Sequence, residues 1–216
     1  MRTIILARTE ELKSAINQFG CITIPQLTKF YPPSPTKYRN TGELPTEAEC
    51  AQAVNTLISK RMAVADENGV IYPFIATDTA STEKNDRVID AIWAFLEYVK
   101  RNPENPEVWD LRRELMVNQQ GVSKITYVDA DNNIVKITPV YDEGDVSKLH
   151  VEQESYKELM EEDDKASLKY VFVVRDKDMA KRIGEMNLPM NYTLALLDGK
   201  PGFAPDDYHF LSKKKK

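Results

Sequence analysis

The sequence contains only two cysteines, Cys21 and Cys50, and only two histidines, His150 and His209. So few cysteines exclude a disulfide-stapled scaffold, and both occupy apolar positions of expected elements, so we interpret them as small core residues. Neither histidine has a histidine or cysteine close to it in the sequence, which argues against a zinc site. We therefore expect no bound metal and no other cofactor.

Long apolar runs are also missing. No stretch approaches the roughly 18 residues that a membrane-spanning helix requires. The apolar stretch within residues 1–8 is shorter than the core of a signal peptide, which has about 7–15 residues. With 42% hydrophobic and 29% charged residues, the composition is that of an ordinary globular protein. We expect a cytoplasmic protein with no membrane partner.

Motifs of common catalytic sites are absent from the sequence. The eight glycines are scattered and form no glycine-rich phosphate loop. No Gly-x-Ser-x-Gly motif occurs, and no cysteine lies near a histidine. The sequence therefore predicts a protein that is not an enzyme.

Charge is distributed unevenly along the chain, whose formal net charge is −5. Residues 1–74 carry eight Lys/Arg and seven Asp/Glu, a balance of +1, whereas residues 75–216 carry 21 and 27, a balance of −6. An acidic segment repels phosphate backbones. Any contact with nucleic acid is therefore expected in the N-terminal part.

The N-terminal third has a helical pattern in three segments. Apolar residues at helical spacing run from Thr9 to a stop at Gly20. A short extended piece at 21–22 precedes a second helix over 24–31, where Thr23 and Gln26 form a capping box, and a third helix begins at Thr46. The third helix is followed by two apolar runs around Asn68-Gly69, a signal for a hairpin with a type I′ turn.

This order resembles a winged helix over residues 1–76, with residues 63–74 as the wing. In that fold the third helix enters the major groove of DNA, and amide and hydroxyl side chains read base edges. The predicted partner is double-stranded DNA. The predicted DNA-binding residues lie on the third helix, on the second helix and in the loop between them: Gln52, Asn55, Thr56, Ser59, Lys60, Lys29, Lys37, Tyr38 and Arg39.

Protein binding is an alternative for this module, because winged helices also serve as interaction modules. The expected tip of the wing, Asp66-Glu67-Asn68, is acidic. Wings that contact phosphates usually carry lysine or arginine. A protein partner or a homodimer is therefore kept as the second possibility.

The remainder of the chain is predicted to form a linker at 77–84, an α/β domain at 85–212 and a basic tail at 213–216. Asp142, Glu143 and Asp145 are interpreted as turn residues, and Asp176 as a helix cap. The expected elements are a helix at 85–101, a hairpin at 125–140, helices at 152–163 and 177–186, and strands at 170–174 and 192–197. Residues 102–120 are ambiguous, because Pro103 and Pro106 break the chain, and a further helix at 107–117 is one possibility.

An arrangement of this kind invites comparison with the restriction-endonuclease-like core, and we classify the chain as α+β with a degenerate form of that core. The core uses acidic residues and a lysine two positions after one of them to bind a metal and activate water. Here Lys136 follows Ile134 instead of an acid, and Asp129 and Asp131 fall in a turn. A metal-dependent nuclease therefore remains only a second alternative.

Three segments carry a resemblance over nearly the whole length: residues 91–97, the hairpin at 125–140, and residues 170–176. The chain resembles a family of unknown function that is frequent in mobile elements of gut Firmicutes, whose members pair a winged helix with a small α/β domain. More distantly it is similar to replication-relaxation (mobilisation accessory) proteins. The resemblance implies a DNA-associated accessory protein of a mobile element or a transcription regulator, whose C-terminal domain serves dimerisation or partner contacts. It carries over no catalytic residue.

Overall fold

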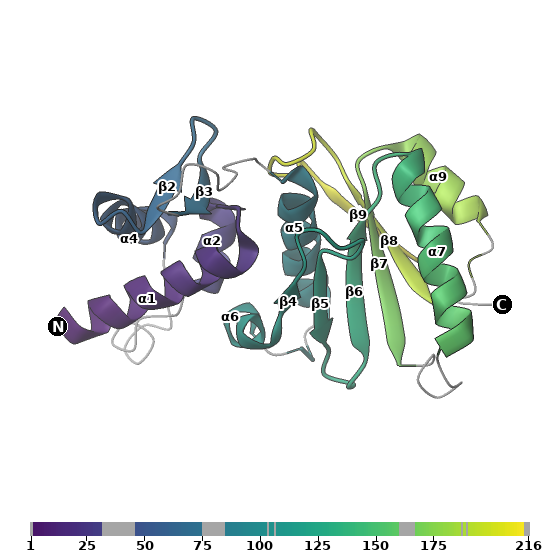
Figure 1. Cartoon of the computed structure of the whole chain (residues 1–216), viewed down its shortest axis with the longest axis horizontal. Coiled ribbons are helices and arrows are strands. Elements are labelled where there is room, and N and C mark those ends of the chain that lie inside the picture. Colours follow the sequence, from purple (N-terminus) through teal and green to yellow (C-terminus); the bar gives the residue numbers. More distant parts are fainter. Residues whose placement is uncertain are drawn as a thin grey trace. The chain divides into compact units, whose positions relative to one another are not determined.

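The computed structural model describes residues 2–31, 46–74, 85–102, 104–105, 107–159, 167–186, 188 and 190–213. The chain is of mixed α+β class, as predicted, with two separate sheets. It divides into two compact units, one formed by Met1–Asn85 with Glu107–Arg113, the other by Asp86–Pro106 with Glu114–Lys216 (Figure 1). The predicted linker at 77–84 lies outside the described residues.

Among the described residues, the N-terminal part of the first unit contains three helices and a small antiparallel sheet. Helix α1 (Arg2–Phe19) ends at Gly20, whose φ of 73° is favourable for glycine. The other two helices are α2 (Ile24–Phe30) and α4 (Glu47–Ser59), and both begin with the predicted capping boxes. Strands β1 (Ile22–Thr23), β2 (Ala63–Ala65) and β3 (Val70–Pro73) form a sheet in the order β1-β3-β2.

The core of the first unit is made mainly by the apolar faces of α1, α2, α4 and β3. Phe19 and Phe30 lie with their ring centroids 5.1 Å apart. Cys21 and Cys50 are both buried and neither forms a disulfide, which confirms that they are core residues. Burial raises the pKa of the Cys50 thiol to about 11. A thiol with so high a pKa is protonated and a poor nucleophile near neutral pH.

The turn between β2 and β3 differs from the predicted type I′ turn. Gly69 has a φ of 74°, but Asn68 does not have a positive φ. The N–H of Gly69 donates to the carbonyl of Asp66, and the N–H of Asp66 donates to that of Val70. This is the three-residue hairpin loop in which only the glycine adopts the left-handed conformation. The hairpin is confirmed and the type I′ prediction is wrong.

The segment 107–117, which the sequence left ambiguous, does not form the one further helix that was considered for it. The segment forms α6 (Val108–Leu111), a 3₁₀ turn (η1, Arg112–Glu114) and strand β4 (Met116–Val117). Arg112 is buried in the first unit, where its guanidinium pairs with Glu11 and its carbonyl accepts a hydrogen bond from Gln18. The chain thus returns to the first unit before it continues into the second.

The second unit is built on α5 (Asp86–Arg101) and a six-stranded sheet in the order β4-β5-β6-β7-β8-β9. Strands β6, β7 and β8 are parallel to one another, and the outer pairs are antiparallel. The predicted strands correspond to four of these, while β4 and β9 were not predicted. Beyond β4, the elements are β5 (Ile125–Val128), β6 (Ile134–Pro139), α7 (Glu143–Leu159), β7 (Leu168–Val174), α9 (Lys177–Glu185), β8 (Tyr192–Leu197) and β9 (Tyr208–Lys213).

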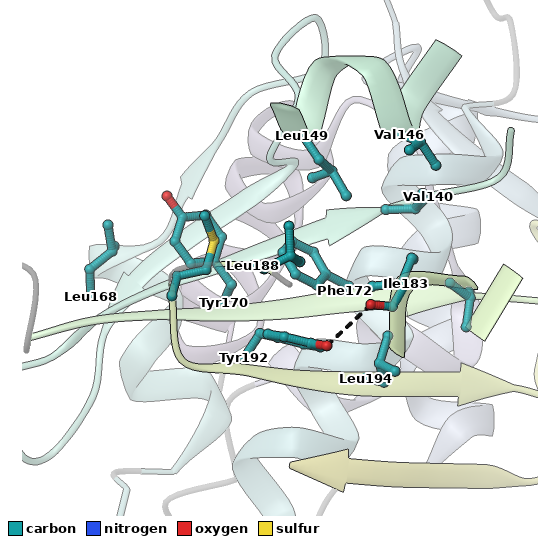
Figure 2. Packing of buried hydrophobic residues seen from close by; sticks show 12 residues of the cluster. Val140, Val146, Leu149, Leu168, Tyr170, Phe172, Ile183, Leu188, Tyr192 and Leu194 are labelled. Atoms are coloured by element: carbon teal, nitrogen blue, oxygen red, sulfur yellow. Dashed lines mark hydrogen bonds between the residues drawn. The ribbon is translucent and has the colours of Figure 1, made fainter. Parts of the chain in front are cut away.

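The two faces of this sheet pack against different helices. On one face α5 contributes Phe95, whose ring meets Tyr127 of β5 edge-on at 5.1 Å. On the other, which we call the α7 face, helices α7 and α9 complete a buried cluster with β7 and β8, in which the Tyr192 hydroxyl donates to the carbonyl of Ile183 (Figure 2). No helix among the described residues is long and apolar enough to cross a membrane.

Helix α7 begins nine residues before the predicted start at 152. The side chain of Asp142 accepts a hydrogen bond from the N–H of Asp145, which satisfies one of the open donors at the helix start. Interpreting Glu143 and Asp145 as turn residues was therefore wrong, since both lie in the first turn of the helix, whereas Asp142 lies in the bend that precedes it. The prediction for Asp176 is confirmed, because its side chain caps α9 by accepting from the N–H of Asp178.

Candidate nucleic-acid interface

Helix α4 presents a polar face on the surface of the first unit. Its apolar side, formed by Cys50, Val54 and Leu57, is buried and packs against α1 and α2. Of the predicted reading residues, Gln52 and Asn55 lie on the opposite side and are exposed. Burial of one stripe therefore fixes which side chains α4 offers to a partner.

The two hydroxyl residues of this face are engaged within the helix. Thr56 donates its hydroxyl to the carbonyl of Gln52 at 3.0 Å, and Ser59 donates its hydroxyl to the carbonyl of Thr56 at 2.9 Å. Such back-bonding is a common local alternative for serine and threonine in helices. Thr56 is half-buried and Ser59 is exposed. The amides of Gln52 and Asn55 are therefore better placed to read bases than the hydroxyls.

Positive charge gathers at the C-terminal end of α4. Lys60 caps the helix through its backbone N–H, and Arg61 follows with a φ of 55°, a conformation that non-glycine residues seldom adopt. Both side chains are exposed, as is Lys29 in the last turn of α2. Lys37, Tyr38 and Arg39 lie outside the described residues. Arg61 was not among the predicted site residues, although its place beside Lys60 in the sequence was a sufficient signal.

The acidic residue at the start of the hairpin loop has a structural role. Asp66 accepts hydrogen bonds from the N–H groups of Asn68 and Val70 and from the hydroxyl of Tyr72. Burial acts to raise the pKa of Asp66, but these hydrogen bonds outweigh it and hold the pKa below its usual value. Its charge is thus committed to shaping the loop, and Glu67 is the exposed acid there.

A second group of polar side chains, which the sequence did not reveal, lies inside the second unit. Asp90 of α5 is fully buried and pairs with Arg175, which follows β7 and is 5% exposed on its side chain. The carboxylate also accepts from the backbone N–H of Gly202 and from the hydroxyl of Tyr141. Each carboxylate oxygen is satisfied from within the unit, so the arrangement holds structure together and leaves little capacity for a ligand.

A neighbouring ion pair joins α5 to the start of α7. Asp145 has a nearly buried carboxylate that lies 2.9 Å from the guanidinium of Arg87 and accepts from the N–H of Tyr141 at 3.0 Å. Lys148 adds a contact at 3.3 Å. Burial acts to raise the pKa of Asp145, but the hydrogen bonds from Tyr141 and Arg87 lower it below its usual value.

This lowered pKa predicts a specific pH dependence. A carboxylate whose folded-state pKa is depressed stabilises the fold above about pH 4, and the contribution is lost as pH falls through the folded pKa. Asp145→Asn is therefore expected to reduce the free energy of unfolding at neutral pH and to reduce it far less at a pH below the folded-state pKa of Asp145. Urea unfolding at several pH values measures the difference, with the exposed Asp178→Asn on α9 as control. A deficit of equal size at all pH values would contradict the assignment.

The described residues include no group of three or more His, Cys, Asp or Glu side chains placed to hold a metal ion. Asp129 accepts the N–H groups of Asp131 and Asn133 within the turn of the β5–β6 hairpin and pairs with Lys169 at 2.8 Å. The acid expected in the turn is thus a structural residue, as the sequence suggested. No family model matches the chain, and no curated protein or solved structure matches it either.

Proposed function

We propose that the first unit is a winged helix that binds double-stranded DNA through α4, and that the protein is a non-enzymatic regulator or accessory of a mobile element. The observation that carries the proposal is the exposed amide face of α4, with Gln52 and Asn55 beside Lys60 and Arg61. Amides can pair with adenine in the major groove, and the cations can contact phosphates.

The order of elements supports the winged-helix assignment. Helix, short strand, helix, helix and hairpin follow one another, and β1 pairs with β3 to complete a three-stranded sheet beside the helices. In such a module α4 is the recognition helix and β2–β3 is the wing. A helix held by its buried stripe offers the groove a rigid reading surface.

We further infer that the second unit is a degenerate restriction-endonuclease-like domain without activity. The order α5, β4, β5, β6, α7, β7 supports this assignment. On β6, Lys136 follows Ile134 and Val135, so the acid that would hold a metal two positions before the lysine is missing. A metal-dependent DNA cleavage assay in which the full chain cut DNA would contradict the inference.

Charge reversal at the end of α4 tests the DNA proposal most directly. The double variant Lys60→Glu/Arg61→Glu is expected to bind a 30-base-pair duplex at least about tenfold more weakly at low salt, because two phosphate contacts become repulsive. Fluorescence anisotropy of labelled duplexes with the full chain measures the affinity. The matched control is Lys181→Glu/Arg182→Glu on α9, another exposed Lys-Arg pair, which is expected to change the affinity little.

Two further readouts separate DNA reading from general attraction. Gln52→Ala/Asn55→Ala is expected to reduce the preference among duplex sequences while leaving the salt dependence unchanged. The wild-type salt slope is expected to be shallow, because each phosphate contact contributes about −0.9 and few cations are available. Equal losses in the α4 and α9 variants, or no duplex binding at all, would favour the protein-adaptor alternative that the exposed acids Glu47 and Glu67 suggest.

A further inference from the structure

Part of the α7 face carries large apolar side chains that are exposed to solvent. Strand register places Met116 beside Thr126 and Thr126 beside Lys136, and it aligns Lys136 with Tyr170, which belongs to the cluster under α7. Side chains paired in register lie on the same side of a sheet. The row from Met116 to Tyr170 therefore runs from an exposed edge to a buried core on a single face.

Exposure of apolar side chains is concentrated on this part of the sheet. Met116 is 66% exposed, and the cross-strand pair Val128 and Ile134 is 42% and 38% exposed. Val151, on the adjacent helix α7, is 69% exposed. These four are the majority of the six large hydrophobic side chains that are exposed within the described parts of the chain. Clustered exposed apolar residues mark interaction surfaces more often than scattered ones do.

A groove of about 570 Å³ lies within this area, and we call it the β4–α7 groove. Its charged lining residues are Lys136 and Lys148. The Lys136 ammonium lies 5.5 Å from the Tyr170 ring centroid. Lys148 is 60% exposed on its side chain and lies 3.3 Å from the Asp145 carboxylate, which Arg87 already neutralises, so Lys148 keeps positive charge for a partner. Among the side chains that the structure describes, no carboxylate lines the groove. The main lining residues are Met116, Val122, Thr126, Lys136, Lys148 and Val151.

The groove is thus a cationic and apolar exception in an acidic half of the chain. Residues 75–216 have a balance of −6, yet the charged groups that line the groove, among the described side chains, are two lysines. Burying the exposed valine and methionine against apolar side chains of a partner lowers the free energy of the complex. Carboxylates of the partner would complement the charge of the lysines at the margin of the groove. A nucleic-acid backbone would pair with the lysines but would leave the apolar side chains exposed to water. An apolar and acidic peptide would contact both kinds of side chain.

A second copy of the chain fits this surface poorly. In a two-fold symmetric dimer the same patch meets itself, so the lysines of one copy would approach those of the other. Like charges brought together across an interface are unfavourable. Charge complementarity therefore selects a partner of opposite sign.

We propose that the β4–α7 groove binds a peptide segment of a partner protein that combines apolar side chains with aspartate or glutamate. The apolar side chains lie on Met116, Val122 and Val151, and the acidic ones pair with Lys136 and Lys148. This surface belongs to the second unit, so the proposal is independent of DNA binding by the first.

Selection from a phage-displayed library of random 16-residue peptides on the immobilised full chain tests the proposal. The recovered peptides are expected to be rich in acidic and apolar residues, and a fluorescent copy of the strongest one gives the affinity by anisotropy. Met116→Glu and Val151→Ser are each expected to weaken binding several-fold or more. The control is Leu211→Glu, which changes a 61% exposed leucine on β9 and is expected to leave binding unchanged.

A charge swap gives the sharpest readout. The variant Lys136→Glu/Lys148→Glu is expected to lose its affinity for the acidic peptide. It is expected to bind instead the same peptide with its acidic residues replaced by lysine. Circular dichroism verifies that each variant is folded. If a charged variant does not fold, Val151→Ser on the helix surface still tests the proposal. The proposal is overturned if no acidic-apolar peptides are recovered, or if binding ignores these substitutions. It is also overturned if only a small amphiphile such as dodecanoate binds, or if Met116→Glu abolishes a dimer of the chain.

Discussion

Replacing Asp90 with alanine is expected to lower the free energy of unfolding of the second unit by about 3–5 kcal/mol, the range observed when one partner of a buried ion pair is removed. Arg175 donates to the Asp90 carboxylate through Nε at 2.8 Å and through Nη2 at 2.6 Å. Without the carboxylate, the guanidinium stays buried with its charge uncompensated. The backbone N–H of Gly202 and the hydroxyl of Tyr141 lose their acceptor as well.

Urea unfolding followed by the fluorescence of Trp93 measures this effect in a Trp109→Phe background, because Trp93 lies on α5 in the second unit. The matched control is Glu97→Ala on the same helix, which breaks the more exposed pair with Arg101 and is expected to cost less than about 1 kcal/mol. Similar losses for the two variants would contradict the special role of Asp90.

A paired replacement distinguishes an uncompensated charge from lost packing. Asp90→Leu combined with Arg175→Met is expected to recover much of the stability, since apolar residues of similar size often replace a buried ion pair without loss. Arg175 also donates to the carbonyls of Asp198 and Phe203, so the chain between β8 and β9 loses two anchors in the double variant. Faster proteolysis of that segment, in a protein with restored global stability, is the expected signature.

The pair also illustrates what the sequence could not reveal. Asp90 and Arg175 are 85 residues apart, and each has a plausible local explanation, Asp90 as a polar residue of a helix and Arg175 as part of a charged helix start. The pairing depends on β7 ending against α5, which is a tertiary fact. Local signals, by contrast, predicted the capping boxes at Thr23 and Thr46, because such boxes are complete within four residues.

In the candidate interface, too, the sequence predicted some features and not others. The apolar period of α4 predicted an exposed face of Gln52, Thr56 and Ser59, flanked by Asn55, because burying one stripe determines the opposite face. Gln52, Ser59 and Asn55 are exposed, whereas Thr56 is half-buried. The period did not predict that the hydroxyls of Thr56 and Ser59 donate hydrogen bonds to carbonyls of the helix. Serine and threonine hydroxyls in a helix can bond either to such carbonyls or to water, and the sequence does not distinguish the two. Strand β9 was not predicted because His209, Ser212 and Lys213 interrupt its apolar pattern.

Replacing Phe172 with alanine is expected to lower the free energy of unfolding of the second unit by about 3–5 kcal/mol, the usual cost of removing a buried phenyl group. Phe172 is 1% exposed on β7 and lies between Tyr170 and Tyr192, with ring centroids 5.7 Å and 5.3 Å away. It occupies the middle of the cluster beneath α7 and α9 (Figure 2). The cavity left by the ring cannot close without moving a helix or a neighbouring strand.

The control is Phe210→Ala, because Phe210 is only half-buried on the edge strand β9, where it contacts Tyr98 and Arg101. It is expected to cost less than half as much in the same urea titration. If α4 binds DNA from the first unit, full-length Phe172→Ala should retain its duplex affinity at urea concentrations at which the weakened second unit has unfolded and the first unit has not. A loss of affinity in parallel with stability would show that DNA binding requires the second unit, and the reading surface would then have to extend beyond α4.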